Sequence, residues 1–212
     1  MSGRSRLLVA AAGLLCVTLC SAAPDFAMER ASDDARYAAA RVLASDDNQS
    51  MPFAIVDKRD ARIYVFEPAG RLIGASAVLL GSAPGDRSVT DIATRSAGSL
   101  APWERTTPAG RFAAEPGHND KGEAIVWVDY DASLAIHRLR PAPAVEQRVA
   151  RMASATPDDN RISLGCIVVP VAFYESVIAP SLGSRRSVVY VLPESRPAQA
   201  LFDAVELSLR AD

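Results

Sequence analysis

The chain has 212 residues, including 23 Lys and Arg, 25 Asp and Glu and 2 His, and its formal net charge is −2. A hydrophobic content of 49% with 23% charged residues is typical of one globular domain with at most a small appendage, and it excludes disordered chains and fibrous repeats. The near balance of charges leaves no basic surplus for binding phosphates, which argues against a nucleic-acid-binding protein.

The first 22 residues have the pattern of a secretory signal peptide. Arg4 and Arg6 precede an uncharged apolar run over residues 7–19, and small residues follow at 21–23. As a helix this run is about 20 Å long, short of the about 30 Å hydrocarbon core of a bilayer. We therefore expect cleavage after Ala22, export to the periplasm or cell envelope, and no stable membrane insertion after cleavage. Retention of the segment as an anchor is the alternative.

The mature chain divides by pattern into an N-terminal helical segment (23–50), a strand-rich domain (51–194) and a C-terminal helix (195–212). Small and apolar residues at helical spacing predict helices in four places. These are Asp25–Ser45, Pro143–Ala153, Val171–Ile178 and Pro197–Arg210.

Short runs rich in β-branched and aromatic residues, bounded by turn-forming residues, predict the strands. They are Phe53–Val56, Ile63–Phe66, Leu72–Leu80, Gly110–Glu115, Ala124–Tyr130, Ser133–Leu139 and Ser187–Leu192. Strands outnumber helices and do not alternate with them, which argues against a doubly wound parallel sheet. We therefore expect a mainly-β, β-rich α+β fold with helices on its periphery.

Residues 81–106 have no hydrophobic period and contain several glycines and prolines. A segment of this length inside a compact domain is usually disordered or a functional lid. Its Trp103 is expected to be a core anchor, with a substrate contact as the alternative.

Removal of the signal peptide leaves Cys166 as the one cysteine of the mature chain, so no internal disulfide can form. Such a thiol is an intermolecular partner, a reactive group or a buried apolar residue. Cys166 follows Gly165 and precedes a helix expected to begin near Pro170. The positive end of that helix would favour the thiolate.

A thiol that attacks an acyl carbonyl needs a base to take its proton and return it to the leaving group. His118 lies in a polar stretch that reads as a solvated surface turn, whereas His137 closes the apolar run Leu134–Ile136. His137 is therefore the better candidate for the base, with a structural role at a strand end as the alternative.

Several ordered elements together resemble the L,D-transpeptidase (YkuD-type) family of bacterial cell-wall enzymes. The family signature is a histidine that closes a strand and, later, Ser/Thr-His-Gly-Cys followed one residue on by Asn or Arg. His137 and the segment Ser163–Cys166 supply these two elements here. Thr107–Phe112 is similar to the family's Thr-Pro-x-Gly-x-Phe, and an opening hairpin spans residues 54–66. The resemblance covers about Pro52–Pro193.

Three features depart from the family pattern. Leu164 replaces the second histidine of the signature, and Val168 stands where Asn or Arg is expected. The gap over residues 138–162 is longer than usual, and the helix expected at Pro143–Ala153 is the plausible insertion. We expect Val168 to remove a polar group that would orient the substrate or the cysteine loop.

The resemblance implies an L,D-transpeptidase-like β-sandwich and ping-pong acyl transfer on peptidoglycan stem peptides through a Cys166 thioester, with His137 as the proton shuttle. The N–H groups of Gly165 and Cys166 are candidates for the oxyanion site. Ser163 is expected to hold the loop or the histidine, or to be a plain turn residue. No cofactor is implied, and two histidines with one cysteine offer no spacing for a metal site.

Two alternatives stay open. If water replaces the acceptor amine, the same Cys166 and His137 pair gives an L,D-carboxypeptidase or hydrolase. A catalytically impaired cell-wall-binding domain on the same fold, with Cys166 buried and inert, is supported by Leu164 and Val168.

Overall fold

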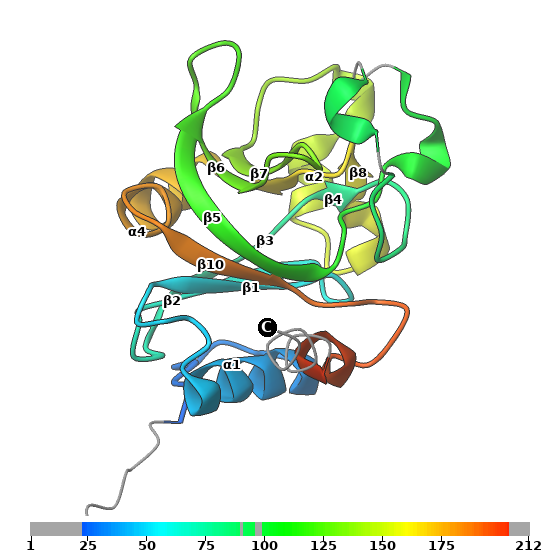
Figure 1. Cartoon of the computed structure of the whole chain (residues 1–212). Helices are drawn as coiled ribbons and strands as arrows, with labels where there is room; N and C mark the ends of the chain where they lie inside the picture. Colours follow the sequence, from blue (N-terminus) through cyan, green and yellow to red (C-terminus); the bar gives the residue numbers. More distant parts are fainter. Residues whose placement is uncertain (1–22, 90, 96–98, 204–212) are drawn as a thin grey trace, which may run out of the picture.

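The computed structural model describes residues 23–89, 91–95 and 99–203 (Figure 1). The expected signal peptide, residues 1–22, lies outside the described residues, and so does the last part of the expected C-terminal helix. Within the described ranges no helix has the length and apolar character needed to cross a bilayer.

Eight strands form one sheet in the order β3-β2-β1-β10-β5-β6-β7-β9. A separate parallel pair joins β4 to β8. The strands are β1 (Phe53–Asp57), β2 (Arg62–Phe66), β3 (Leu72–Ala77), β4 (Leu80–Gly81), β5 (Gly110–His118), β6 (Ala124–Asp129), β7 (Leu134–Arg138), β8 (Arg161–Ser163), β9 (Ile167–Val169) and β10 (Ser187–Val191).

The long, curved strand β5 links the two halves of the sheet (Figure 1). Its first part, Gly110–Ala114, pairs with β10, and its second part, Glu115–His118, pairs with β6. Pro116 lies in the second part, where β5 has a strand partner on one side only, the kind of edge position to which proline is confined within sheets. The strand therefore leaves one half of the sheet and enters the other, which folds the sheet over on itself.

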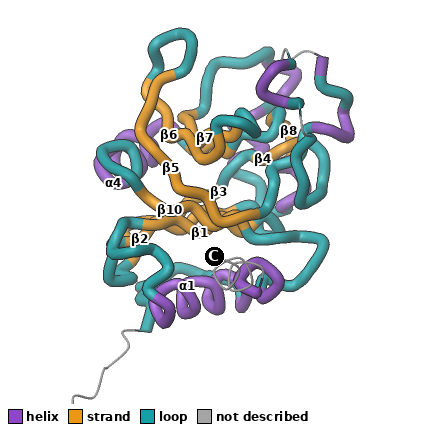
Figure 2. Tube along the Cα trace, in the orientation of Figure 1, coloured by secondary structure: helices purple, strands orange, loops and turns teal. Residues whose placement is uncertain are grey.

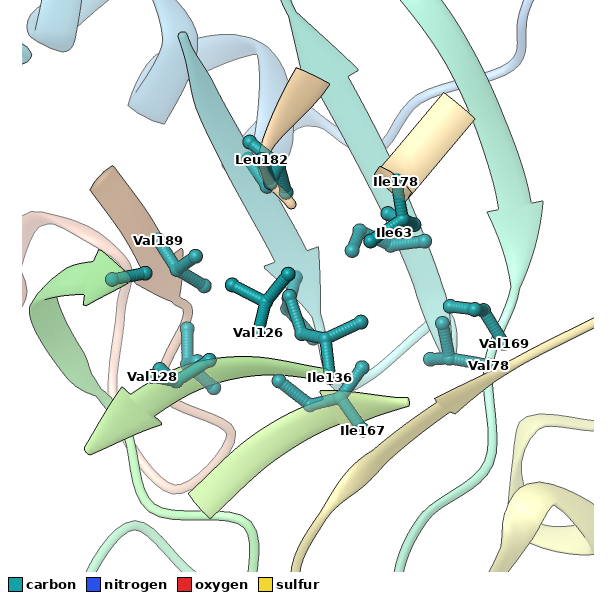
Figure 3. Packing of buried hydrophobic residues seen from close by; sticks show 14 of the residues in the cluster. Ile63, Val78, Val126, Val128, Ile136, Ile167, Val169, Ile178, Leu182 and Val189 are labelled. Atoms are coloured by element: carbon teal, nitrogen blue, oxygen red, sulfur yellow. The ribbon is translucent and has the colours of Figure 1, made fainter. Parts of the chain in front are cut away.

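The main core lies between the two halves of this folded sheet. Val126, Ile136 and Ile167 from one half point toward Ile63 and Val189 from the other, and all five are fully buried (Figure 3). Period-2 alternation along the strands produces this apolar face. The structure thus confirms the expected mainly-β sandwich with helices at its periphery.

A second core covers the outer face of β1, β2 and β10. It packs Phe53 and Tyr190 against helix α1 (Asp33–Ser45) and against Phe202 of the short helical stretch at 199–203. Figure 2 shows these two helical segments side by side beneath the strands. The remaining helical elements are η1 (Ile92–Thr94), η3 (Pro102–Glu104), η4 (Ala144–Glu146), α2 (Arg148–Met152), η5 (Pro157–Asn160), α3 (Val171–Phe173), η6 (Tyr174–Ile178) and α4 (Ala179–Ser181).

The helices differ from expectation at their ends. Helix α1 begins at Asp33 instead of Asp25, because the Ser32 side chain caps it by accepting from the Ala35 N–H at 3.0 Å. The expected helix at Pro143–Ala153 is broken into η4 and α2, since Gln147 has a left-handed backbone with φ of 47°.

The strands differ in three places. The expected run Leu72–Leu80 divides into β3 and β4, and Val78 between them donates instead to Ala61 O at 2.9 Å. Strand β5 extends to His118, which is exposed at a strand end and not in a turn. Strands β8 and β9 were not expected, because three residues are too few to give a period of two.

Candidate active site

Strand register places Cys166 and His137 on the same face of the sheet. Strands β7 and β9 are parallel, with Ile136 opposite Ile167 and His137 opposite Val168. Since Ile136 and Ile167 point into the main core, alternation turns His137 and Cys166 to the outer face. Cys166 directly precedes β9 and therefore lies beside Ala135, one diagonal step from His137. The two predicted residues are thus brought to one neighbourhood.

His137 is held as a neutral imidazole. Its Nδ1 lies 2.8 Å from Arg138 O, so Nδ1 carries the proton and Nε2 has a free lone pair in the tautomer that this bond requires. Burial lowers the pKa of His137 to about 4, and the nearby Arg140 charge acts in the same direction, while the Arg138 hydrogen bond opposes it. The ring is therefore uncharged at neutral pH and able to accept a proton.

Cys166 is half-buried, and its Sγ donates to Ser133 O at 3.5 Å. Burial raises the pKa of this thiol, so the resting pair is a neutral thiol and a neutral imidazole. Within the described part of the chain no hydrogen bond joins Sγ to the His137 ring, as is common for catalytic pairs without substrate. A proton transfer from Sγ to the ring would require the thiol to turn away from Ser133 O.

The expected stabilisation of the thiolate by a helix N-terminus is wrong. Strand β9 separates Cys166 from helix α3, which begins only at Val171. Three extended residues span about 10 Å, well beyond the first turn to which a helix dipole is confined.

The loop that carries Cys166 is fixed from within by Ser163. Ser163 Oγ accepts from the Gly165 N–H at 3.1 Å and donates to Cys166 O at 2.7 Å. Ser163 therefore holds the loop and not the histidine. Because the Gly165 N–H is engaged in this turn, the Cys166 N–H is left as the candidate oxyanion donor of the two.

Thr107 fixes the same loop from outside, a role that sequence reasoning missed. Its buried hydroxyl donates to Gly165 O at 2.7 Å and accepts from the Gly81 N–H at 2.9 Å. Gly165 has φ of +139°, and a Cβ there would lie 2.9 Å from Thr106 O, so only glycine fits. The motif Thr107–Phe112 carried the signal, because it brings this threonine against the cysteine loop.

Described residues of the segment 81–106 line the pocket into which Cys166 opens. Ile92 and Leu100 from this segment, with Leu134 and Leu164, enclose an apolar pocket of about 170 Å³ beside the thiol. A bidentate pair between Arg95 and Glu104, with both N–O distances 2.8 Å, ties the segment together. The described part therefore has the position of the expected lid.

Trp103 does not anchor the core. It lies on η3 and is 77% exposed, so the core interpretation is wrong. Leu164, which replaces the second signature histidine, is 39% exposed and lines the pocket of Cys166.

Val168 is a packing residue. It is fully buried in a small cluster with Leu79 and with Met152 of α2. The expectation that Val168 leaves the substrate without a polar partner is therefore wrong, because the side chain does not reach the pocket of Cys166. Helix α2 belongs to the segment 138–162, so the side chain of Met152 that packs on Val168 comes from the segment that the sequence indicated as an insertion.

A buried cluster of charged residues contacts Thr107, which holds the cysteine loop, and this cluster was not expected. Lys58 lies in the turn between β1 and β2 and is completely buried, and its Nζ donates to Asp86 at 2.8 Å, Gly85 O at 2.5 Å and Thr107 O at 2.9 Å. Glu194 lies 3.4 Å from the same nitrogen. Burial alone would raise the pKa of Asp86, but hydrogen bonds from Lys58, Ser195 and the Glu194 amide outweigh it and lower that pKa.

No protein-family model and no curated protein matches the sequence. Among solved structures, the chain is similar to the catalytic domain of an L,D-transpeptidase from E. faecium, with 15% identity and a TM-score of 0.39 over 68% of this chain and 98% of that one. It is also similar to an L,D-transpeptidase from Xylanimonas cellulosilytica, with 15% identity and a TM-score of 0.41 over 71% and 67% of the two chains.

A third similar structure is the helical cell shape determining protein Pgp2 from Campylobacter jejuni. The identity is 16% and the TM-score 0.45, and the match covers 69% of this chain but only 49% of Pgp2. These are distant likenesses, in which the chain spans about half of the length of some of the proteins it matches.

Proposed function

We propose that this chain is an exported cysteine acyltransferase of the cell envelope that acts on peptidoglycan stem peptides. The observation that supports the proposal is the register of β7 and β9, which turns Cys166 and His137 to one face of the sheet, while Cys166 lines a pocket on that face. The sequence motifs that resemble the L,D-transpeptidase family supply the substrate class.

In the first half-reaction the thiol proton moves to His137 Nε2 as Cys166 Sγ forms a bond to the carbonyl carbon that follows the L-centre of a tetrapeptide stem. The oxyanion that develops is stabilised by the Cys166 N–H. The C–N bond to the terminal D-alanine then breaks, and His137 returns its proton to the leaving amine. A thioester on Cys166 is left.

In the second half-reaction the side-chain amine of a neighbouring stem attacks the thioester. His137 takes a proton from this amine, the C–S bond breaks, and the proton returns to the departing sulfur. The new amide is a cross-link between two stems. Water in place of the amine gives the carboxypeptidase outcome with the same residues.

A second candidate function is a cell-wall-binding domain without catalysis. Two features of the thiol favour it. Burial raises the pKa of Cys166, and its Sγ donates a hydrogen bond to Ser133 O and not to His137. The two functions differ in whether Cys166 forms a covalent acyl adduct, which can be measured directly.

Intact-mass analysis of the mature protein incubated with a carbapenem tests the proposal. Carbapenems acylate the cysteine of the family that the sequence resembles, so we expect one adduct per chain on the wild type and none on Cys166→Ser. A wild-type chain that stays unmodified would contradict the acyltransferase and favour the binding domain.

A further inference from the structure

Two aromatic side chains form a corner on the outer face of β6. Trp127 lies opposite Glu115 of β5, and its indole covers Gly117, where a Cβ would lie 2.5 Å from the Trp127 Cδ1 atom. Tyr130 meets this indole edge-on, with ring centroids 5.0 Å apart and an interplanar angle of 62°. Tyr130 is 72% exposed, so the corner opens to solvent.

Polar groups surround this aromatic corner. The corner belongs to a pocket of about 500 Å³, within the usual range of small-molecule sites, and Glu115 and Asp129 also line it. The Glu115 carboxylate pairs at 3.1 Å with Arg186, and both side chains are exposed. Flat apolar faces beside carboxylates suit a pyranose ring, whose C–H face packs on aromatic rings while its hydroxyls donate to carboxylate oxygens.

The corner lies in one row of the sheet with the candidate nucleophile. Glu115 pairs with Trp127, Trp127 pairs with Ala135, and Cys166 lies beside Ala135 on the next strand. All four residues are on the outer face, opposite Val126 and Ile136 of the core. Trp127 and Cys166 are thus two strands apart, which is about 10 Å between backbones.

We propose that Trp127 and Tyr130 form a subsite for an amino sugar of the glycan strand to which the donor stem is attached. The inference rests on the proposed function. The attacked carbonyl belongs to the third residue of the stem, and the sugar precedes the first. Three extended residues span about 10 Å, which equals the spacing between the Trp127 and Cys166 backbones across two strands.

The test uses three ligands: an oligosaccharide of N-acetylated amino sugars, a free tetrapeptide stem, and a disaccharide-tetrapeptide. The chain has two tryptophans, so a Trp103→Phe, Cys166→Ser background makes Trp127 the only indole and prevents turnover. We expect the oligosaccharide to change Trp127 emission, and the disaccharide-tetrapeptide to bind at least about ten-fold more tightly than the free tetrapeptide, which is about 1.4 kcal/mol.

In the same background, Tyr130→Ala should bring the two peptide affinities to within about two-fold. The exposure of Tyr130 makes this variant safe for folding, unlike one at Trp127. The matched control compares Cys166→Ser with and without Trp103→Phe. The ratio of the two peptide affinities should be the same in both proteins, since Trp103 does not line this pocket.

Equal affinities for the disaccharide-tetrapeptide and the free tetrapeptide would overturn the subsite, even where the carbapenem still acylates Cys166 and the proposed function stands. Oligosaccharide binding that depends on Tyr130, in a protein whose Cys166 is inert to the carbapenem, would uphold the sugar site and overturn the proposed function. The two failures are therefore distinguishable.

Discussion

Replacement of Lys58 by methionine is expected to lower the free energy of unfolding by about 3–5 kcal/mol. Lys58 Nζ gives all three of its donors to Gly85 O, Asp86 and Thr107 O, and the side chain is fully buried. Methionine fills much of the volume but leaves Asp86 and Glu194 without their shared cation. Chemical denaturation of the mature protein measures the loss.

The matched control for this variant is Lys121→Met, because Lys121 is the other lysine of the chain and is exposed in the β5–β6 turn. It should change the unfolding free energy by less than about 0.5 kcal/mol. Asp86→Asn keeps a hydrogen-bond acceptor for Lys58 and should cost less than Lys58→Met. A loss of under about 1 kcal/mol in Lys58→Met would show that the cluster is not a structural support.

His137→Gln is expected to lower the kcat of acyl transfer by about 10²–10⁴-fold, the usual contribution of a general base. Glutamine retains a polar group at the position of the ring but cannot accept the thiol proton. The measurement is steady-state exchange of the terminal D-alanine of a tetrapeptide stem, with the unfolding free energy of the variant as the control for folding. An unchanged kcat would remove His137 from the mechanism.

The pH dependence of kcat/KM carries a second signature of His137. The neutral ring is the active form, and burial lowers its pKa from the ordinary value of about 6.5 for histidine to about 4. Activity should therefore persist through pH 6 and fall only as the pH approaches about 4, where the ring gains a proton. At the alkaline end, the rate should fall as the thiol, whose pKa is raised by burial, loses its proton, because His137 then has no thiol proton to return to the leaving amine. A wild-type acid limb near the ordinary pKa of histidine would contradict the burial of the ring.

The sequence was sufficient to predict a mainly-β fold, because seven strand runs had clear patterns, and the family resemblance of the motifs around His137 and Cys166 implied the sandwich. It was insufficient where the outcome depends on distant partners. Lys58 meets Thr107 across 49 residues, and Thr107 meets Gly165 across 58, so neither contact leaves a local pattern. The burial of Val168 likewise depends on Met152, which the broken helix brings against it.

The direction of the pKa shift of Cys166 could also not be predicted from the sequence. The helix begins at Val171, next to the expected Pro170, but the three residues between it and the cysteine form the extended strand β9, which holds the helix end away from the thiol. Once the dipole is absent, burial decides the direction of the shift. Whether Cys166 and His137 rest as an ion pair or as two neutral groups thus depends on the three residues of β9, a run too short to show the alternation of a strand in the sequence.

Exchange of a labelled D-amino acid into a tetrapeptide stem by the mature chain from residue 23, compared with Cys166→Ser, tests the acyltransferase most directly. We predict incorporation by the wild type and background incorporation by Cys166→Ser, with unfolding free energies within about 1 kcal/mol of each other. No incorporation by the wild type on any L,D-stem, or undiminished incorporation by Cys166→Ser, would contradict the assignment of Cys166 as the nucleophile.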